Sequence, residues 1–177
     1  MSGAMTTDDE QLANTCRMLR DHGQSKKYYH DIEGYNGRLD AIQAGILRVK
    51  LRKLAEWNEQ RRKCASVYDQ QLVSLEGGIV LPVQPTWAKS VYHLYVIRVP
   101  CRDELRAYLA DEGIGTGIHY PIPLHLQTAY QELGLQKGDF PVSENIASEI
   151  LSLPMYPHLR LDQQQQVGGK VQKFLLR

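Results

Sequence analysis

A polar turn at residues 34–40, GYNGRLD, carries the first side chains whose types suit ligand chemistry. Asn36 offers two amide donors and Arg38 a planar guanidinium, and both groups suit phosphate oxygens. Tyr35 stands beside them, and the helix expected to follow has free backbone amides at its start, which favour an anion. Asn and Gly are also common in ordinary turns. The turn alone therefore leaves phosphate binding and a solvated surface turn both open.

A second group of polar side chains belongs to residues 117–127, GIHYPIPLHLQ. His119 and His125 stand six residues apart, with Tyr120 after the first, and prolines between them fix φ and stiffen the loop. A stiff loop can present polar side chains to a ligand. Neutral imidazoles also bind zinc, but no third or fourth ligand follows at a useful spacing, so we expect no metal site. A rigid loop with satisfied histidines is the alternative interpretation.

Other catalytic patterns are weak or missing in the sequence. The stretch GIGTG at residues 113–117 follows an expected helix and leads into an expected strand, the reverse of the order in a nucleotide-binding fingerprint. There is no Gly-x-Ser-x-Gly elbow and no Gly-rich phosphate loop. Three cysteines stand far apart without paired ligands, as is typical of free thiols in a reducing compartment: Cys16, Cys64 and Cys101.

The overall charge excludes a strong electrostatic attraction to polyanions. Twenty-one Lys and Arg residues against 20 Asp and Glu leave a formal charge of +1, so we expect no nucleic-acid partner and no anionic membrane partner. No apolar run approaches the roughly 20 residues that span a bilayer. The first residues lack the basic and apolar regions of a signal peptide. We therefore expect a cytoplasmic protein.

The first half of the chain predicts helices around a polar turn. After a short strand-like piece, Thr7 or Asp8 can cap a helix, which Gly23 ends. A polar turn follows at residues 24–38. We predict one long helix in residues 39–76, because apolar residues recur there at helical spacing and no proline interrupts it. The main apolar stripe consists of Ile42, Ile46 and Val49.

The second half alternates short strands with helices, which predicts a small α/β or α+β layer domain at residues 77–177. The β-branched and aromatic content of VYHLYVIRV favours a strand, and RDELRAYLADEG reads as an amphipathic helix. A pair of glycines, Gly168 and Gly169, is a weak point in the last helix, whose expected cap is Asp162. The expected elements are strands at 91–99 and 114–121, helices at 102–113, 125–134 and 141–150, an extended segment at 151–157, and the final helix.

Four segments, taken in order, closely resemble the DegT/DnrJ/EryC1/StrS family of PLP-dependent sugar aminotransferases from about Gly3 to near the C-terminus. The resemblance implies an α/β fold, namely the C-terminal part of a fold type I PLP-dependent transferase. It further implies a remnant of the large cofactor domain at 1–38, a long interdomain helix at 39–76 and a small C-terminal domain at 77–177. The segments are residues 8–62, residues 91–99, GIGTGIHYPIPLHLQTAY and GDFPVSENIASEILSLPMYP.

The same resemblance assigns roles to both polar groups. Asn36 matches the family asparagine that reaches the PLP phosphate of the partner subunit in a homodimer, with Tyr35 and Arg38 beside it. His119 and Tyr120 match the segment that lines the sugar-nucleotide pocket, and His125 matches the family's downstream histidine, which we also expect to bind substrate. The substrates that the resemblance implies are a nucleotide-diphosphate keto sugar and an amino-acid donor, for which the family usually uses glutamate.

No residue of this chain matches the family's Schiff-base lysine, which stands upstream of the segment that begins at Gly3, so we expect no catalytic residue here. We therefore expect the C-terminal fragment of a nucleotide-sugar aminotransferase that is inactive alone. Two alternatives stay open. One is a non-catalytic module for sugar-nucleotide binding or dimerisation, and the other is a fragment of a PLP-dependent sugar dehydratase of the same fold, in which histidine replaces the lysine.

Overall fold

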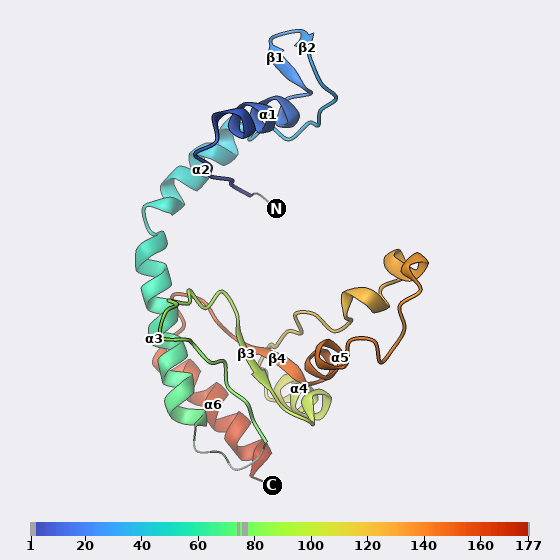
Figure 1. Cartoon of the computed structure of the whole chain (residues 1–177). Helices are drawn as coiled ribbons and strands as arrows, with labels where there is room; N and C mark the ends of the chain where they lie inside the picture. The colour runs from blue at the N-terminus through green and yellow to red at the C-terminus, as the bar shows by residue number, and fades with distance from the viewer. Residues whose placement is uncertain (1–2, 74, 76–77, 177) are drawn as a thin grey trace. The chain divides into compact units, whose positions relative to one another are not determined.

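The computed structural model describes residues 3–73, 75 and 78–176 of the chain (Figure 1). The chain divides into two compact units, Met1–Arg52 and Lys53–Arg177, and each is described by itself below. Within the described residues, no helix combines the length and the apolar character that crossing a membrane requires.

The first unit begins with helix α1, Glu10–Arg20. Its N-cap is Asp9, whose carboxylate accepts the Leu12 amide at 2.9 Å, so the cap lies one or two residues beyond the expected positions. The prediction of a strand-like piece before this helix is wrong, because residues 3–8 form no strand. The helix was expected to stop at Gly23, but it ends at Arg20 with Asp21 as its C-cap. Gly23 lies in the turn that follows, where its φ is +75° and a Cβ would lie 1.6 Å from the Ile32 carbonyl oxygen.

Two short antiparallel strands, β1 at Gln24–Lys26 and β2 at Tyr29–His30, follow where the sequence predicted only a turn. The long helix expected at 39–76 is divided into α2, Ala41–Leu51, and α3, Leu54–Leu72. The break falls at residues 52–53, where the sequence has neither proline nor glycine, so no local signal marks it. Positions 74 and 76 of the expected helix lie outside the described residues.

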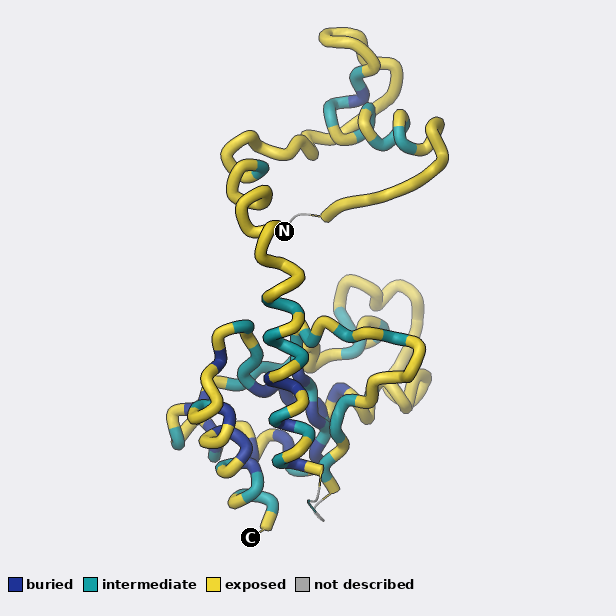
Figure 2. The backbone as a smooth tube through the Cα atoms, turned by 90° about the vertical axis from the view of Figure 1, so that its left-hand side faces the viewer, coloured by how far each residue is buried: buried dark blue, intermediate teal, exposed yellow. Residues whose placement is uncertain are grey.

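The first unit buries almost nothing by itself. Gly23 is the one buried residue among residues 3–52, and Figure 2 shows this unit almost entirely as exposed. The apolar stripe of α2 is therefore on the surface, with Ile42 at 75% and Val49 at 65% exposed. An apolar helix face of this kind gains its stability from packing against a partner surface.

The second unit contains a hydrophobic core around a two-stranded antiparallel sheet. Strand β3, Tyr95–Arg98, pairs with β4, Ile150–Leu153, in a register that places Tyr95 opposite Leu153. Helices α3, α4 (Arg102–Asp111) and α6 (Leu161–Leu175) contribute most of the other buried side chains. The largest fully buried side chains are Tyr68, Tyr95, Leu72, Ile97, Leu105, Leu109, Leu151, Val99 and Val171.

Several expected elements of this unit are shorter than the sequence indicated. The strand expected at 91–99 begins only at Tyr95, because Tyr92 has a φ of +45°, which an extended strand does not allow. The strand expected at 114–121 is reduced to one bridge, between Gly117 and Ser152. The helix expected at 125–134 is two 3-10 turns, η1 at Leu124–Leu126 and η2 at Thr128–Leu133, separated by the extended backbone of Gln127.

The expected helices at 102–113 and 141–150 are confirmed as α4, which Gly113 follows at a φ of +74°, and α5, Pro141–Glu149. The final helix is also confirmed, although its N-cap is Arg160 rather than Asp162. Gly168 lies where α6 packs against α3, and a Cβ there would lie 2.0 Å from the Oε1 atom of Gln71. That close approach explains the first glycine of the pair.

Candidate functional site

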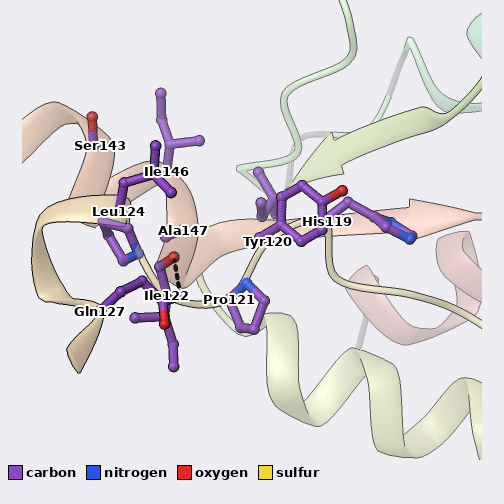
Figure 3. A pocket seen from close by; sticks show the side chains of 11 residues that line it. His119, Tyr120, Pro121, Ile122, Leu124, Gln127, Ser143, Ile146 and Ala147 are labelled. Atoms are coloured by element: carbon purple, nitrogen blue, oxygen red, sulfur yellow. Dashed lines mark hydrogen bonds between the residues drawn. The ribbon is translucent and has the colours of Figure 1, made fainter. Parts of the chain in front are cut away.

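A cavity of about 570 Å³ lies in the second unit beside the proline-rich loop (Figure 3). One side of it consists of the loop from His119 to Leu124 with Gln127 after η1, and the other side comes from α5 and the start of β4. His119 and Tyr120 lie at one end of the cavity in this view, and Leu124 and Ser143 at the other. The lining residues are His119, Tyr120, Pro121, Ile122, Pro123, Leu124, Gln127, Ser143, Ile146, Ala147 and Ile150.

The ring of His119 is oriented by a core strand. Its Nδ1 atom lies 2.9 Å from the Oγ atom of Ser152 in β4. The backbones of Gly117 and Ser152 exchange two hydrogen bonds, of 3.1 and 2.7 Å, which fix the distance between loop and strand. A Cβ on Gly117 would lie 2.7 Å from the Cε1 atom of His119, so a larger residue here would require the ring to shift. The Nε2 atom makes no hydrogen bond to another described residue.

Tyr120 presents a largely free aromatic ring. It is 76% exposed, and its ring meets the His119 ring edge-on at a centroid distance of 5.9 Å. None of the residues that line the cavity carries an Asp, Glu, Lys or Arg side chain. Apolar walls with a few polar groups at the end are typical of sites for organic ligands that have both an apolar face and hydroxyl groups.

His125 stands apart from this lining. Its Nε2 atom lies 2.9 Å from the Oε1 atom of Glu144, and its side chain is only 7% exposed. Its ring packs against Phe140 at a centroid distance of 4.8 Å. The contact of His125 with substrate stays a prediction. In this structure, the imidazole is hydrogen-bonded to Glu144.

Backbone amides stabilise the ionised carboxylate of Glu144. The amide of Gly138 donates to both of its carboxylate oxygens at 2.8 and 3.0 Å, and the amide of Phe140 donates at 3.4 Å. These hydrogen bonds, first that of Gly138, hold the pKa of Glu144 below its usual value, and His125 adds to the effect. The carboxylate is therefore ionised at neutral pH.

The turn of the first unit forms a separate hollow of about 430 Å³, lined by Asn36, Arg38, Leu39 and Asp40. The side-chain amide of Asn36 makes no hydrogen bond within the described part of the chain. The Nε atom of Arg38 lies 3.5 Å from the Oδ1 atom of Asp21, a loose and exposed ion pair. These donors are free to bind a phosphate group, so their chemistry fits one.

The start of α2 is less available to an anion than the sequence indicated. Asp40 is its N-cap and accepts the Ile42 amide at 2.8 Å, so this carboxylate already occupies one first-turn donor. The backbone of Tyr35 is held by hydrogen bonds with Leu19 at 2.7 Å and His22 at 2.9 Å, while its side chain is exposed. The turn is thus anchored to the end of α1, and the side chains of Tyr35 and Asn36 make no hydrogen bond to another described residue.

Sequence reasoning missed the residues that hold the site in place. Ser152, Gly117 and Glu144 orient His119 and His125, but each acts through a contact far along the chain, for which the local pattern has no signal. No group of three or more His, Cys, Asp or Glu residues in the described ranges is arranged to hold a metal ion.

Comparison with known sequences shows the class of protein to which this fold and candidate site belong. The sequence profile of the DegT/DnrJ/EryC1/StrS aminotransferase family matches residues 2–172, and the chain belongs to this family. The family and the α/β fold predicted from the sequence are thereby confirmed.

Two curated relatives and two solved structures are closely similar. A pleiotropic regulatory protein of Geobacillus stearothermophilus is 47% identical, over 97% of this chain and 46% of its own length. The dTDP-3-amino-3,4,6-trideoxy-alpha-D-glucose transaminase of Streptomyces venezuelae is 42% identical, over 97% and 45%. The chain thus spans just under half the length of these relatives.

Among solved structures, S. venezuelae DesV in complex with a ketimine intermediate matches with a TM-score of 0.93 and 42% identity, over 97% of this chain and 46% of that one. NtdA from Bacillus subtilis, with bound cofactor PMP, matches with a TM-score of 0.87 and 31% identity, over 97% and 41%. One of these neighbours, NtdA, therefore carries the cofactor PMP.

Proposed function

We propose that this chain is the C-terminal part of a cytoplasmic nucleotide-sugar aminotransferase. The complete enzyme moves an amino group from an amino acid, glutamate in this proposal, to a keto sugar carried on a nucleoside diphosphate. The observation that supports it most is the similarity of residues throughout the chain to a dTDP-sugar transaminase, at 42% identity. The chain by itself does not catalyse transamination in this proposal.

The turn of the first unit would hold the phosphate of pyridoxal phosphate bound to a partner subunit. When bound, this cofactor supplies the electron sink for amino-group transfer. Asn36 would donate its amide hydrogens to the phosphate, and Arg38 would add a positive charge. Tyr35 lies next to them on the anchored turn. The free donors of Asn36 and the looseness of the Arg38 ion pair support this assignment.

The cavity of the second unit would bind the sugar nucleotide. Tyr120 presents an exposed ring suited to stacking, and His119 has a free Nε2 atom to hydrogen-bond a hydroxyl or carbonyl oxygen. The apolar wall suits the faces of a sugar or base. His125 acts in this proposal on the shape of the cavity, as argued below, rather than on the ligand.

The organisation of the complete enzyme is part of the proposal. Residues 1–38 would belong to the large cofactor domain, residues 39–76 would connect the domains, and residues 77–177 would form the small C-terminal domain. The enzyme would be a homodimer. The exposed apolar stripe of α2 supports the proposal that a partner surface covers it, because exposure of apolar side chains to water is unfavourable in free energy.

The test measures binding and turnover separately on the 177-residue chain. We expect dTDP-glucose to bind the wild-type chain in calorimetry and to bind Tyr120→Ala at least tenfold more weakly. We expect no 2-oxoglutarate to form from glutamate, pyridoxal phosphate and a dTDP-linked 3-keto-6-deoxyhexose. Formation of 2-oxoglutarate would contradict the inactivity of the chain, and equal binding to both proteins would contradict the pocket. Loss of water from the sugar, without amino transfer, would also contradict the inactivity of the chain and would favour the dehydratase.

A further inference from the structure

The two walls of the cavity come from η1 and α5, which lie well apart in the sequence. Leu124 and Gln127 form one wall, at η1 and just after it. Helix α5 supplies most of the other wall. Its lining residues are Ser143, Ile146 and Ala147.

One side-chain pair joins these walls. His125 directly follows Leu124 in η1, and Glu144 directly follows Ser143 in α5, so each partner is the neighbour of a lining residue. The Nε2 atom of His125 lies 2.9 Å from the Oε1 atom of Glu144. In the described part of the chain, this is the one side-chain hydrogen bond between η1 or η2 and α5. This pair is therefore a direct polar link between the two walls.

The connecting segment between the walls is held by the same carboxylate. Glu144 accepts the amides of Gly138 and Phe140, and the Phe140 ring packs on His125. Gly138 has a φ of +103°, a conformation that favours glycine. The carboxylate thus fixes an imidazole and two amides at once.

Burial distinguishes this pair from an exposed ion pair of the same unit. The side chains of His125 and Glu144 are 7% and 12% exposed, whereas those of Arg160 and Asp162 are 66% and 68% exposed. A shielded pair is screened less by salt and loses less rotamer freedom when it forms. It can therefore hold a wall, whereas an exposed pair contributes little.

We propose that His125 is a positioning residue that, through Glu144, sets the width of the cavity and does not touch the ligand. The identity of the ligand as a sugar nucleotide rests on the proposed function, but the role of the pair in holding the walls does not. The role follows from the position of the two residues, one next to each wall, and from the bonds between them.

The experiment records ¹³C-methyl NMR spectra of the 177-residue chain with and without dTDP-glucose. The methyl groups of Leu124 and Ile146 report on the two walls, and those of Leu151 report on the core. In His125→Ala we expect the wall signals to shift or broaden without ligand while the Leu151 signals stay in place. His125→Gln, whose amide can still donate to Glu144, should restore the wall signals. Asp162→Ala, which breaks an exposed pair, is the control and should change none of them.

Ligand affinity completes the test. We expect dTDP-glucose to bind His125→Ala about tenfold more weakly, and His125→Gln nearly as well as the wild type. Glu144→Gln, a milder change of the same pair, serves if His125→Ala does not fold, and should also move the wall signals. Unchanged wall signals would overturn the proposal, and so would lost binding with unchanged wall signals, which would mean that His125 contacts the ligand. If dTDP-glucose fails to bind the wild type, the wall signals still decide the role of His125.

Discussion

The Nδ1 atom of His119 lies 2.9 Å from the Oγ atom of Ser152, a buried residue in the core strand β4. A residue of the cavity is therefore oriented by the hydrophobic core, 33 positions along the chain. The Gly117 bridge to the same strand holds the loop at the distance that this hydrogen bond needs. Changes in the strand should consequently appear in the cavity.

Replacement of the strand hydroxyl tests this link. We expect Ser152→Ala to free the His119 ring and to lower the free energy of unfolding by about 1 kcal/mol, the typical contribution of such a hydrogen bond. Nitrogen NMR of the imidazole should show the change at Nδ1, and dTDP-glucose should bind more weakly. Ser148→Ala is the control, because the Ser148 hydroxyl bonds only within α5, at 2.7 Å. Equal spectra for both variants would contradict the link.

Two glycines near the cavity should differ in their tolerance of a methyl group. A Cβ on Gly117 would lie 2.7 Å from the His119 ring, whereas a Cβ on Gly115 would have open space around it. We expect Gly117→Ala to displace the ring and weaken ligand binding severalfold, with Gly115→Ala close to wild type. Calorimetry with dTDP-glucose checks both, and a normal affinity in Gly117→Ala would show that the ring need not move.

The glycine pair of the last helix should also behave asymmetrically. Gly169 has nothing within 4 Å of a built Cβ, so Gly169→Ala should raise the free energy of unfolding by about 1 kcal/mol through helix propensity. At Gly168 the new methyl group would displace the Gln71 side chain, so the same change should give no gain or a loss. Urea denaturation of the two variants measures the difference. A similar gain at both positions would mean that Gln71 moves aside without cost.

The Glu144 carboxylate should make stability depend on acidic pH. Its pKa in the folded chain is lowered, first by the Gly138 amide, while in the unfolded chain it returns to the ordinary value of about 4.3. The folded state therefore binds the proton less well, so the stabilisation is complete above the unfolded pKa and is lost as pH falls through the folded pKa. Urea titrations between pH 3 and 7 should show that the stability difference between wild type and Glu144→Gln shrinks below about pH 4. A difference that does not change with pH would contradict the assignment.

The exposed stripe of α2 should drive association. Ile42 and Val49 are 75% and 65% exposed, and burial of such side chains typically contributes about 1.5–3 kcal/mol each. We expect light scattering at micromolar concentration to detect dimers or larger species, and the double variant Ile42→Ser with Val49→Ser to shift them toward monomer. Val142→Ser, at a residue 70% exposed on α5, should not have that effect. A wild-type chain that is entirely monomeric would refute the expectation.

Local patterns predicted the helices best. The amphipathic spacing in residues 102–113 predicted α4, because helix formation depends on neighbours three and four positions apart. The strands were predicted too long, since their true length depends on the partner strand. β3 begins only at Tyr95, after the positive φ of Tyr92, and that conformation leaves no trace in the β-branched and aromatic composition.

The sequence by itself determined the family, through motifs in the order and spacing that its members share. It also determined which polar side chains residues 34–40 and 117–127 offer to a phosphate or sugar ligand. Only the tertiary structure decided which groups orient these side chains. Ser152 acts on His119, and Glu144 acts on His125, across 33 and 19 positions. Such contacts arise when strand pairing and helix packing bring distant segments together, and no local propensity or periodicity records them.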